Sequence, residues 1–254
     1  MSTLVFSIAL GGYERLFGKC IRTHRAFCKN YGYKYILANR TPGILQPMEA
    51  AWLKIPLIIL ALENHWDWVM FIDADCEIRP FCPPIESVIK HNKSVYLVPG
   101  YSGRPNSGVI IVRQHPDALT FFRAILKNAD RSVPEEDRAL YENGHVIYYS
   151  KQNSTVEILN RRWNNNAEFK QESFIQHYSG GPLRSFYLST PDARFWNLML
   201  RIYRKGIRLI SKVINKKRST VGEDSLVNRL AQYTKFYKEH YPSFMHTDET
   251  ETNC

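Results

Sequence analysis

The stretch Val69-Met70-Phe71-Ile72-Asp73-Ala74-Asp75 joins four apolar residues to two closely spaced aspartates. A short, uncharged apolar run of this kind is typical of a buried strand. Alternate side chains of an extended segment point to the same face, so Asp73 and Asp75 can converge on one cation. Carboxylate oxygens suit hard divalent ions such as Mn²⁺ and Mg²⁺. The stretch therefore predicts a strand that ends at a metal site.

An Asp-x-Asp triplet by itself is weak evidence, because about one is expected by chance in a chain of this length. The alternative is a solvated turn with two surface acids. The surroundings favour the metal site, since an apolar strand precedes the triplet and Pro80 and Pro83 follow it. Two carboxylates at the end of a buried strand repel each other unless a cation lies between them.

Strand and helix patterns alternate through the first half of the chain. Strands are expected at 3–9, 33–38, 69–72, 95–98 and 109–112, and helices at 14–30 and 49–64, with Pro56 kinking or bounding the second helix. This order predicts an α/β fold with a mixed, mostly parallel central sheet flanked by helices. Ligands of such sheets bind beyond the carboxyl ends of the strands, which is where Asp73 and Asp75 stand.

The second half is less regular. Helices are expected at 116–128, 135–142, 193–218 and 223–240, and strands at 145–149, 156–159 and 173–177. We divide the chain into a catalytic domain, residues 1–190, and a basic C-terminal helical extension, residues 191–254.

The composition describes a globular chain of 254 residues with a formal charge of +10, which favours an anionic partner such as nucleic acid, an acidic membrane surface or a phosphorylated substrate. Five cysteines without a close pair suggest thiols in a reducing compartment. No apolar run is long enough to span a membrane, and no signal peptide precedes the first strand. If the chain is complete, we expect a cytoplasmic protein that can touch a membrane without crossing it.

The segment 201–218 is rich in Lys and Arg and contains no acid. With Ile202, Leu209 and Val213 it forms a basic amphipathic helix, a type that lies in anionic lipid interfaces. It would hold the chain beside a lipid-linked substrate. The alternative is a helix packed on the domain with a solvated basic face.

A second polar stretch, Gln176-His177-Tyr178-Ser179-Gly180, follows an apolar strand pattern. Its histidine can supply a third metal ligand, Gly180 allows backbone to approach a phosphate, and Arg184 can contact that phosphate. The alternative is a structural histidine beside a turn. Tyr13, after the first strand, either stacks on a nucleotide base or is a rim aromatic. The run Trp163-Asn164-Asn165-Asn166 fits a polar loop near the site or an ordinary turn and receives no role.

Together these segments resemble the GT-A fold glycosyltransferases, closest to families 8 and 34, over roughly residues 3–185. Phe71-Ile72-Asp73-Ala74-Asp75 resembles the family's metal turn, and Asn106-Ser107-Gly108-Val109-Ile110-Ile111 resembles its Asn-small-Gly strand, which touches the donor sugar. The His-Tyr pair at 177–178 resembles the late segment whose His completes the metal site. The Trp52-x-Lys54-Ile55 stretch is similar to family 34, and by that resemblance Lys54 faces the donor.

The resemblance implies transfer of a hexose or pentose from a UDP-sugar to a saccharide or lipid-linked acceptor, with Mn²⁺ or Mg²⁺ and with retention of anomeric configuration. No nucleic-acid partner is expected. Two departures stand out: Arg184 occupies the position near which Lys is frequent, and the usual Asp-Gln pair is reduced to Asp137. The expected site residues are Asp73, Asp75 and His177 for the metal; Tyr13, Lys54, Asp73, Asn106, Gly180 and Arg184 for the donor; and Asp137 and Asn106 for catalysis.

Two rival functions remain at this stage. Net charge and aromatic content fit a nucleic-acid binder without enzymatic activity, although no recognition motif is present. An Asp-x-Asp pair can also supply the nucleophile of a metal-dependent phosphohydrolase. The glycine-threonine continuation of that class is missing after Asp75.

Overall fold

The structure is a computed structural model that describes residues 1–43, 45–180, 182–215 and 225–246. The strands are β1 (Thr3–Ile8), β2 (Lys34–Ala38), β3 (Trp68–Ile72), β4 (Cys76–Ile78), β5 (Val95–Pro99), β6 (Pro105–Arg113), β7 (Val156–Ile158) and β8 (Ile175–His177). The α-helices are α1 (Tyr13–Leu16), α2 (Gly18–Tyr31), α3 (Pro47–Trp52), α4 (Lys54–Glu63), α5 (Pro116–Lys127), α6 (Asn143–Ser150), α7 (Pro182–Ser189), α8 (Pro191–Asn215) and α9 (Leu226–His240). Short 3-10 helices are η1 (Ile85–Val88), η2 (Glu135–Asp137), η3 (Arg161–Trp163) and η4 (Pro242–Phe244).

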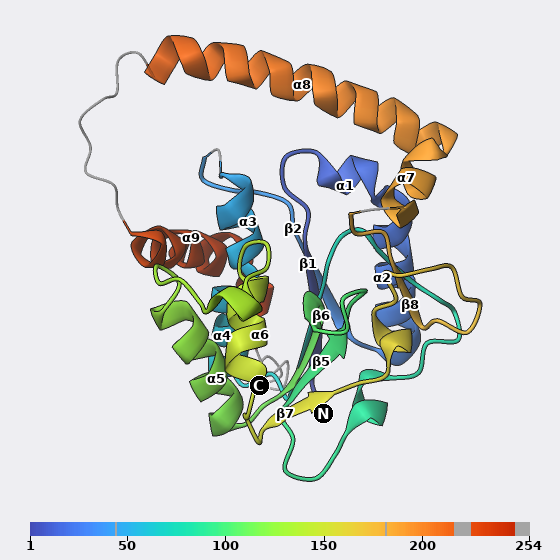
Figure 1. Cartoon of the computed structure of the whole chain (residues 1–254), viewed down its shortest axis with the longest axis vertical. Helices are drawn as coiled ribbons and strands as arrows, with labels where there is room; N and C mark the ends of the chain where they lie inside the picture. Colours follow the sequence, from blue (N-terminus) through green and yellow to red (C-terminus); the bar gives the residue numbers. More distant parts are fainter. Residues whose placement is uncertain (44, 181, 216–224, 247–254) are drawn as a thin grey trace, which may run out of the picture.

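The central sheet has the strand order β2-β1-β3-β6-β5-β7, and β4 pairs with β8 in a separate two-stranded sheet (Figure 1). The strand β6 runs antiparallel to β3 and β5, while β1–β2, β1–β3 and β5–β7 pair in parallel, so β6 alone opposes the direction of the others. The expected α/β class with a mostly parallel sheet is confirmed. The amino end of β6 meets the carboxyl end of β3 at one edge, which brings the Asn106 segment to the acidic turn.

Helices cover both faces of this sheet, and the central strand β3 is therefore buried along its whole length. Val69 and Phe71 point into a core shared with α4, α5 and α9, whereas Met70 and Ile72 point into a core shared with α2 and η1. Figure 1 shows α4, α5 and α9 on one side of the sheet and α2 on the other. Complete burial of apolar side chains of this size stabilises the fold by about 1.5–3 kcal/mol each, which fixes the strand that carries the acids.

Two predicted helices are divided. The helix expected at 14–30 is broken at Phe17 into α1 and α2, and the one expected at 49–64 is broken at Leu53 into α3 and α4. Pro56 neither kinks nor bounds α4. It is the third residue of that helix, where a backbone N–H has no partner within the helix in any case.

Two predictions of secondary structure were wrong. The strand expected at 145–149 is part of the helix α6, in which Val146 packs into the main core. Its aromatic and β-branched residues favour a strand, but tertiary packing overrides this preference. The helix expected at 135–142 is limited to the single turn of η2, and the positive φ of 57° at Tyr141 is incompatible with a helix there.

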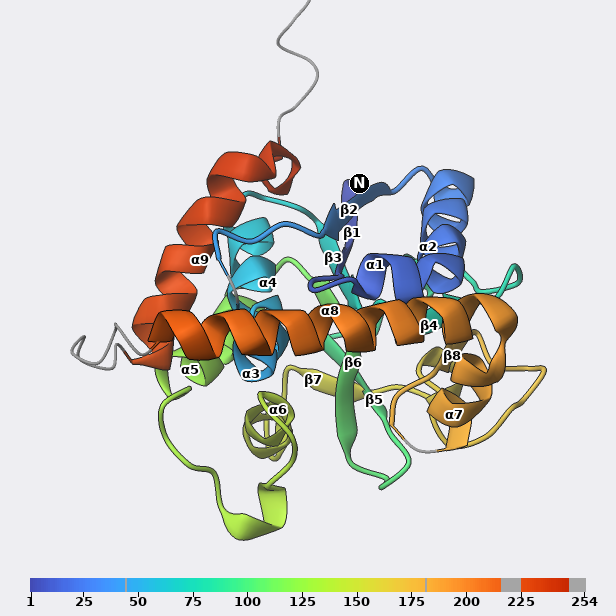
Figure 2. The same ribbon diagram turned by 90° about the horizontal axis from the view of Figure 1, so that it is seen from above.

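The C-terminal elements differ in their packing. Leu226, Leu230 and Tyr237 of α9 belong to the main core, whereas α8 contacts the body near α1, where Leu200 closes over Gly12. Seen from above, α8 crosses the carboxyl ends of the central strands (Figure 2). None of the helices in the described ranges is long and apolar enough to cross a bilayer. Residues 216–218 of the basic segment lie outside the described residues, and the domain boundary at residue 190 stays a prediction.

Candidate functional site

The two aspartates lie in a tight turn between β3 and β4. The N–H of Asp73 donates to the carbonyl oxygen of Gly108 at 2.8 Å, and the N–H of Cys76 donates back to the Asp73 carbonyl at 3.0 Å. The Asp73 side chain is 33% exposed and that of Asp75 only 9%. The turn therefore presents one carboxylate towards solvent and holds the other inside the protein.

Pairing of β4 with β8 places His177 opposite Cys76, directly beside this turn. The Nε2 atom of His177 lies 3.2 Å from Asp75 Oδ1 and 3.8 Å from Asp73 Oδ2. The structure thus brings together the three residues expected to bind the metal. The imidazole passes over Gly108, where a Cβ atom would lie only 2.3 Å from His177 Cε1. A glycine at this position of the Asn-Ser-Gly strand makes the close approach possible.

The donor set fits a hard or borderline divalent ion. Two carboxylates and one imidazole supply oxygen and nitrogen, which Mn²⁺ accepts readily and Mg²⁺ accepts in part. The Cys76 Sγ atom also lies within 4.8 Å of ligand atoms of Asp75 and His177. Burial raises the pKa of the Cys76 thiol well above its ordinary value. A soft sulfur donor also suits Mn²⁺ and Mg²⁺ less well than carboxylate oxygens do.

The two carboxylates have different electrostatic surroundings. Partial burial raises the pKa of Asp73, the Lys54 ammonium opposes this change, and the Asp75 charge adds to the rise. Burial would also raise the pKa of Asp75, but the charge and hydrogen bond of His177, with the charge of Arg184, lower it to about 2. A divalent cation between them would favour the ionised form of both groups.

A buried lysine connects the acidic turn to α6. Lys54, the first residue of α4, is 4% exposed, and its Nζ lies 2.8 Å from Glu142 Oε1 and 3.5 Å from Asp73 Oδ1. Burial would lower the pKa of Lys54, but these two carboxylates raise it, so the ammonium stays charged. The hydroxyl of Ser107 donates to the same Glu142 oxygen at 2.7 Å. Lys54 therefore lies on the buried side of the site and contacts it through its ion pair with Asp73.

Glu142 received no role from the sequence, whereas Asp137 was expected to be the acid on the acceptor side. Asp137 is 1% exposed and its Oδ1 lies 2.5 Å from Lys151 Nζ, while Glu142 contacts Lys54. The catalytic role of Asp137 stays a prediction. Glu142 directly precedes α6, at the end of the segment 135–142 that was expected to be a helix.

Comparison with known proteins identifies the type of fold. No protein-family model and no curated protein matches the sequence. Among solved structures, the chain is similar to a glycosyltransferase involved in the glycosylation of the major capsid of PBCV-1, with 18% identity over 74% of this chain and 98% of that one and a TM-score of 0.57. The fold is that of a glycosyltransferase.

A second similarity agrees. The glycosyltransferase GlyE of Streptococcus pneumoniae TIGR4, in two crystal structures of which one is the apo form, is 11% identical over 81% of this chain and 64% of its own, with TM-scores of 0.51 and 0.52. At these identities the similarity establishes the glycosyltransferase fold and leaves substrates and residue roles to be argued from the site.

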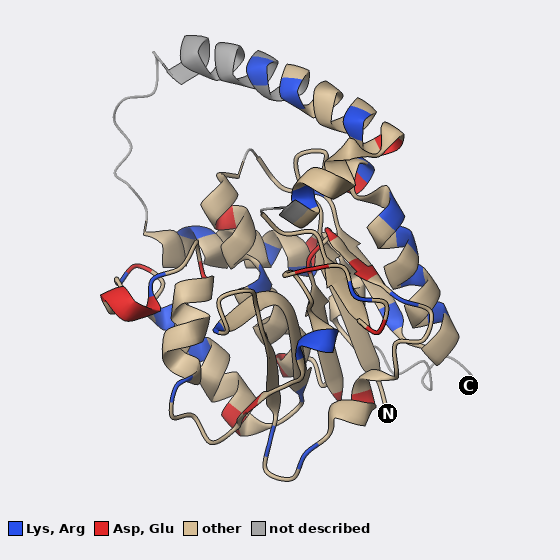
Figure 3. Ribbon diagram, turned by 45° about the vertical axis from the view of Figure 1, so that its right-hand side comes forward, with Lys and Arg blue, Asp and Glu red and all other residues tan. Residues whose placement is uncertain are grey.

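In this glycosyltransferase fold, the residues expected to contact the donor lie at different distances from the acidic turn. Arg184 of α7 pairs with Asp75 Oδ2 at 2.6 Å and lies over the ring of Phe17, 4.7 Å from its centroid. The Tyr13 ring lies 5.3 Å from the same Phe17 ring. Gly180 is exposed between β8 and α7, with open space where a Cβ would lie. Figure 3 shows acidic residues gathered at the ends of the central strands and basic residues recurring along α8.

Two side chains of α2 form hydrogen bonds with the backbone of β4 along its other edge. The His24 Nε2 lies 2.7 Å from the Cys76 carbonyl oxygen, and the N–H of Ile78 donates to Thr23 Oγ1 at 2.9 Å. Burial lowers the pKa of His24 to about 4, so the ring is neutral near pH 7 and its Nε2–H donates to the carbonyl. Because β8 occupies one edge of β4 and α2 the other, the strand following the acidic turn is held on both sides.

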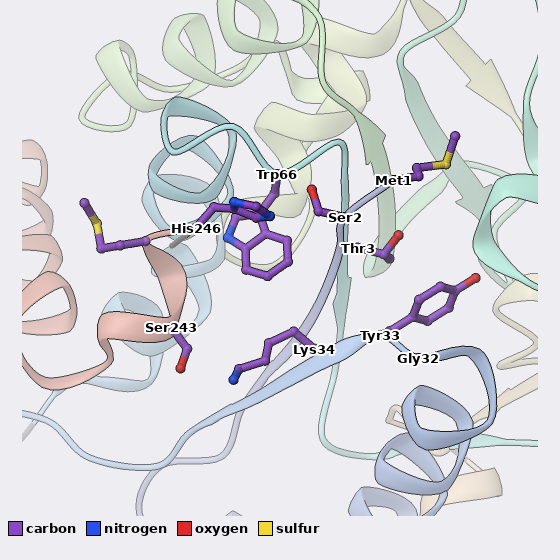
Figure 4. Close-up of a pocket in the computed structure, with 10 residues that line it drawn as sticks. Met1, Ser2, Thr3, Gly32, Tyr33, Lys34, Trp66, Ser243 and His246 are labelled. Atoms are coloured by element: carbon purple, nitrogen blue, oxygen red, sulfur yellow. The ribbon is translucent and has the colours of Figure 1, made fainter. Parts of the chain in front are cut away.

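A separate surface hollow of about 450 Å³ lies at the amino end of β1 and includes Lys34 and Trp66 (Figure 4). The acidic turn follows the carboxyl end of β3, and β3 is parallel to β1. The hollow is therefore at the opposite edge of the sheet, and it contains none of the residues expected to bind the metal or the donor.

Proposed function

We propose that this chain is a metal-dependent glycosyltransferase that moves a hexose or pentose from a UDP-sugar to a saccharide acceptor. The observation that supports it most is the meeting of Asp73, Asp75 and His177 at the carboxyl edge of the sheet of a glycosyltransferase fold. These three residues would hold Mn²⁺ or Mg²⁺. The bound ion would neutralise the charge that grows on the leaving diphosphate.

The surrounding residues have separable tasks in this proposal. Lys54 keeps positive charge beneath Asp73, so the carboxylate pair can ionise in a buried setting. Arg184 forms an ion pair with the second carboxylate oxygen of Asp75, and we place its guanidinium where an anionic donor would approach. Asn106 is expected to contact the donor sugar, with Tyr13 and Gly180 at the nucleotide and phosphate side.

The transfer itself is proposed to retain the anomeric configuration, as in the families 8 and 34 that the sequence resembles. The bond between the anomeric carbon and the diphosphate oxygen breaks, and its electron pair leaves with the diphosphate. The acceptor hydroxyl oxygen bonds to the anomeric carbon from the same face and passes its proton to the leaving phosphate. An NMR spectrum with an inverted anomeric centre in the product would rule this route out.

The first test is ligand binding. We expect Mn²⁺ with UDP to raise the melting temperature of the wild-type chain by about 5–10 °C at a hundred-fold excess over Kd, since a ligand that binds only the folded state stabilises it. UDP with a chelator in place of Mn²⁺ should give a much smaller shift. A differential scanning measurement without any shift in the presence of both ligands would contradict the proposal.

We also propose that the extension 191–254 places the enzyme on an anionic membrane, beside a lipid-linked saccharide acceptor. Ala193 and Leu200 face the body, whereas Phe195, Leu198 and Ile202 are more than half exposed on another face of α8. Arg194, Arg201 and Lys205 are exposed and border that apolar face at helical spacing. Apolar insertion together with about 1 kcal/mol per cation favours an anionic lipid surface.

Sedimentation with vesicles tests this part separately. Vesicles containing an anionic phospholipid should bind the full chain, and vesicles of a zwitterionic phospholipid alone should bind it much less. The double variant Phe195→Ser/Leu198→Ser should lower binding at least about ten-fold, because both side chains lose their insertion into lipid. Equal binding of the variant and the wild type would exclude this face as the contact.

A further inference from the structure

Asn164, in the run to which the sequence analysis gave no role, is completely buried behind the candidate metal site. Its Oδ1 lies 2.8 Å from His177 Nδ1, and its Nδ2 lies 2.9 Å from Asn106 Oδ1. It therefore stands between the imidazole expected to bind the metal and the amide expected to contact the donor sugar.

The hydrogen bonds of this network determine one another. The backbone N–H of Gly108 donates to Asn106 Oδ1 at 3.0 Å, so this end of the Asn106 amide is the acceptor. The group of Asn164 that faces it must then be the NH₂, a donor. The other end of the Asn164 amide is consequently the carbonyl oxygen, which can only accept, and the Nδ1 atom of His177 must carry the hydrogen.

A hydrogen on Nδ1 leaves Nε2 to face the aspartates, where it can ligate a cation through its lone pair or, without a cation, donate to Asp75. Nε2 is the atom 3.2 Å from Asp75 Oδ1. Histidines that bind metals usually donate the second ring N–H to such a partner, which fixes both the tautomer and the ring orientation.

The backbone around Asn164 is hydrogen-bonded to β8, the strand that carries His177. The N–H of Asn165 donates to the Ile175 carbonyl and the N–H of His177 donates to the Asn165 carbonyl, both at 2.9 Å. These bonds hold the Asn164 segment against β8, and Trp163 packs the segment into the core.

We propose that Asn164 is the positioning residue of the metal centre: it holds His177 as the Nδ1–H tautomer with Nε2 directed at the Asp73–Asp75 turn, and it ties this imidazole to Asn106. The metal-binding part of this inference rests on the proposed function, whereas the tautomer does not.

The test uses two readouts on the full chain. In metal-free protein above neutral pH, ¹⁵N NMR of the histidine rings should show a hydrogen on Nδ1 of His177 in the wild type. Mn²⁺ affinity, read from the electron paramagnetic resonance of the free ion, should fall about 10–100-fold in Asn164→Leu, which removes both hydrogen bonds at similar volume. Asn164→Asp keeps an acceptor for Nδ1–H but loses the donor to Asn106, so its Mn²⁺ affinity should fall clearly less than that of Asn164→Leu, which a general loss of structure would not produce.

Asn166→Leu is the matched control, because the Asn166 amide donates to the Ser179 hydroxyl and, within the described part of the chain, makes no hydrogen bond to His177. Its Mn²⁺ affinity should equal that of the wild type. An Nε2–H tautomer in the wild type, or unchanged Mn²⁺ binding in Asn164→Leu, would overturn the inference. An Nδ1–H tautomer in a wild type that binds no Mn²⁺ would instead count against the proposed function and leave the positioning of His177 intact.

Discussion

Replacing Asp75 by Asn is expected to lower the Mn²⁺-dependent transfer rate, as kcat/KM, by about three orders of magnitude. Loss of metal-assisted charge stabilisation costs several kcal/mol in the transition state, and each 1.36 kcal/mol corresponds to a factor of about ten. Asp75 is the most exacting position because its two oxygens face His177 and Arg184 separately. Asparagine keeps the size but removes the charge and one acceptor.

The control is Asp117→Asn, which makes the same chemical change on a side chain that is 66% exposed in the first turn of α5. Its transfer rate should match that of the wild type. If Asp75→Asn keeps Mn²⁺-dependent turnover within ten-fold of the wild type, Asp75 is not a metal ligand. The rates should be measured at several Mn²⁺ concentrations, so that weakened metal binding is separated from a slower chemical step.

Replacing Lys54 by Met is expected to lower the free energy of unfolding by about 3–5 kcal/mol, because it leaves a buried charge without its partner. Glu142 is 2% exposed, and its Oε1 is 2.8 Å from the ammonium that the substitution removes. Asp73 loses the same cation but is partly exposed to water. Most of the cost should therefore come from Glu142. Urea unfolding of the metal-free chain measures it.

The double variant Lys54→Met/Glu142→Gln should recover more than half of that loss, since no buried charge then remains unpaired. Lys235→Met, on the exposed side of α9, is the control and should change stability by less than about 0.5 kcal/mol. A Lys54→Met variant within 1 kcal/mol of the wild type would show that water or a relaxed structure compensates Glu142.

The local pattern at 69–75 was sufficient to predict the strand, the turn and the sheet edge, because burial of an uncharged run and the position of the acids are both local properties. His177 required the family resemblance. Nothing near His177 in the sequence shows that β8 pairs with β4, and this pairing alone brings the imidazole to Asp75.

Glu142 and Asn164 were missed for different reasons. Glu142 stands at the end of the segment 135–142, which was expected to be a helix and in which only Asp137 received a role. Asn164 lies in a polar run that looks like an ordinary turn, and its significance comes from two hydrogen-bond partners distant in sequence. In both cases the role depends on long-range contacts.

The pairing of β4 with β8 has a consequence for how the centre is made. During synthesis the acidic turn leaves the ribosome well before the histidine strand does, so a nascent chain presents two mutually repelling carboxylates without their imidazole. Under the proposed function, a cation can therefore meet all three of its ligands only after β8 has docked on β4, and a chain that ends before residue 175 has the acidic turn without the imidazole.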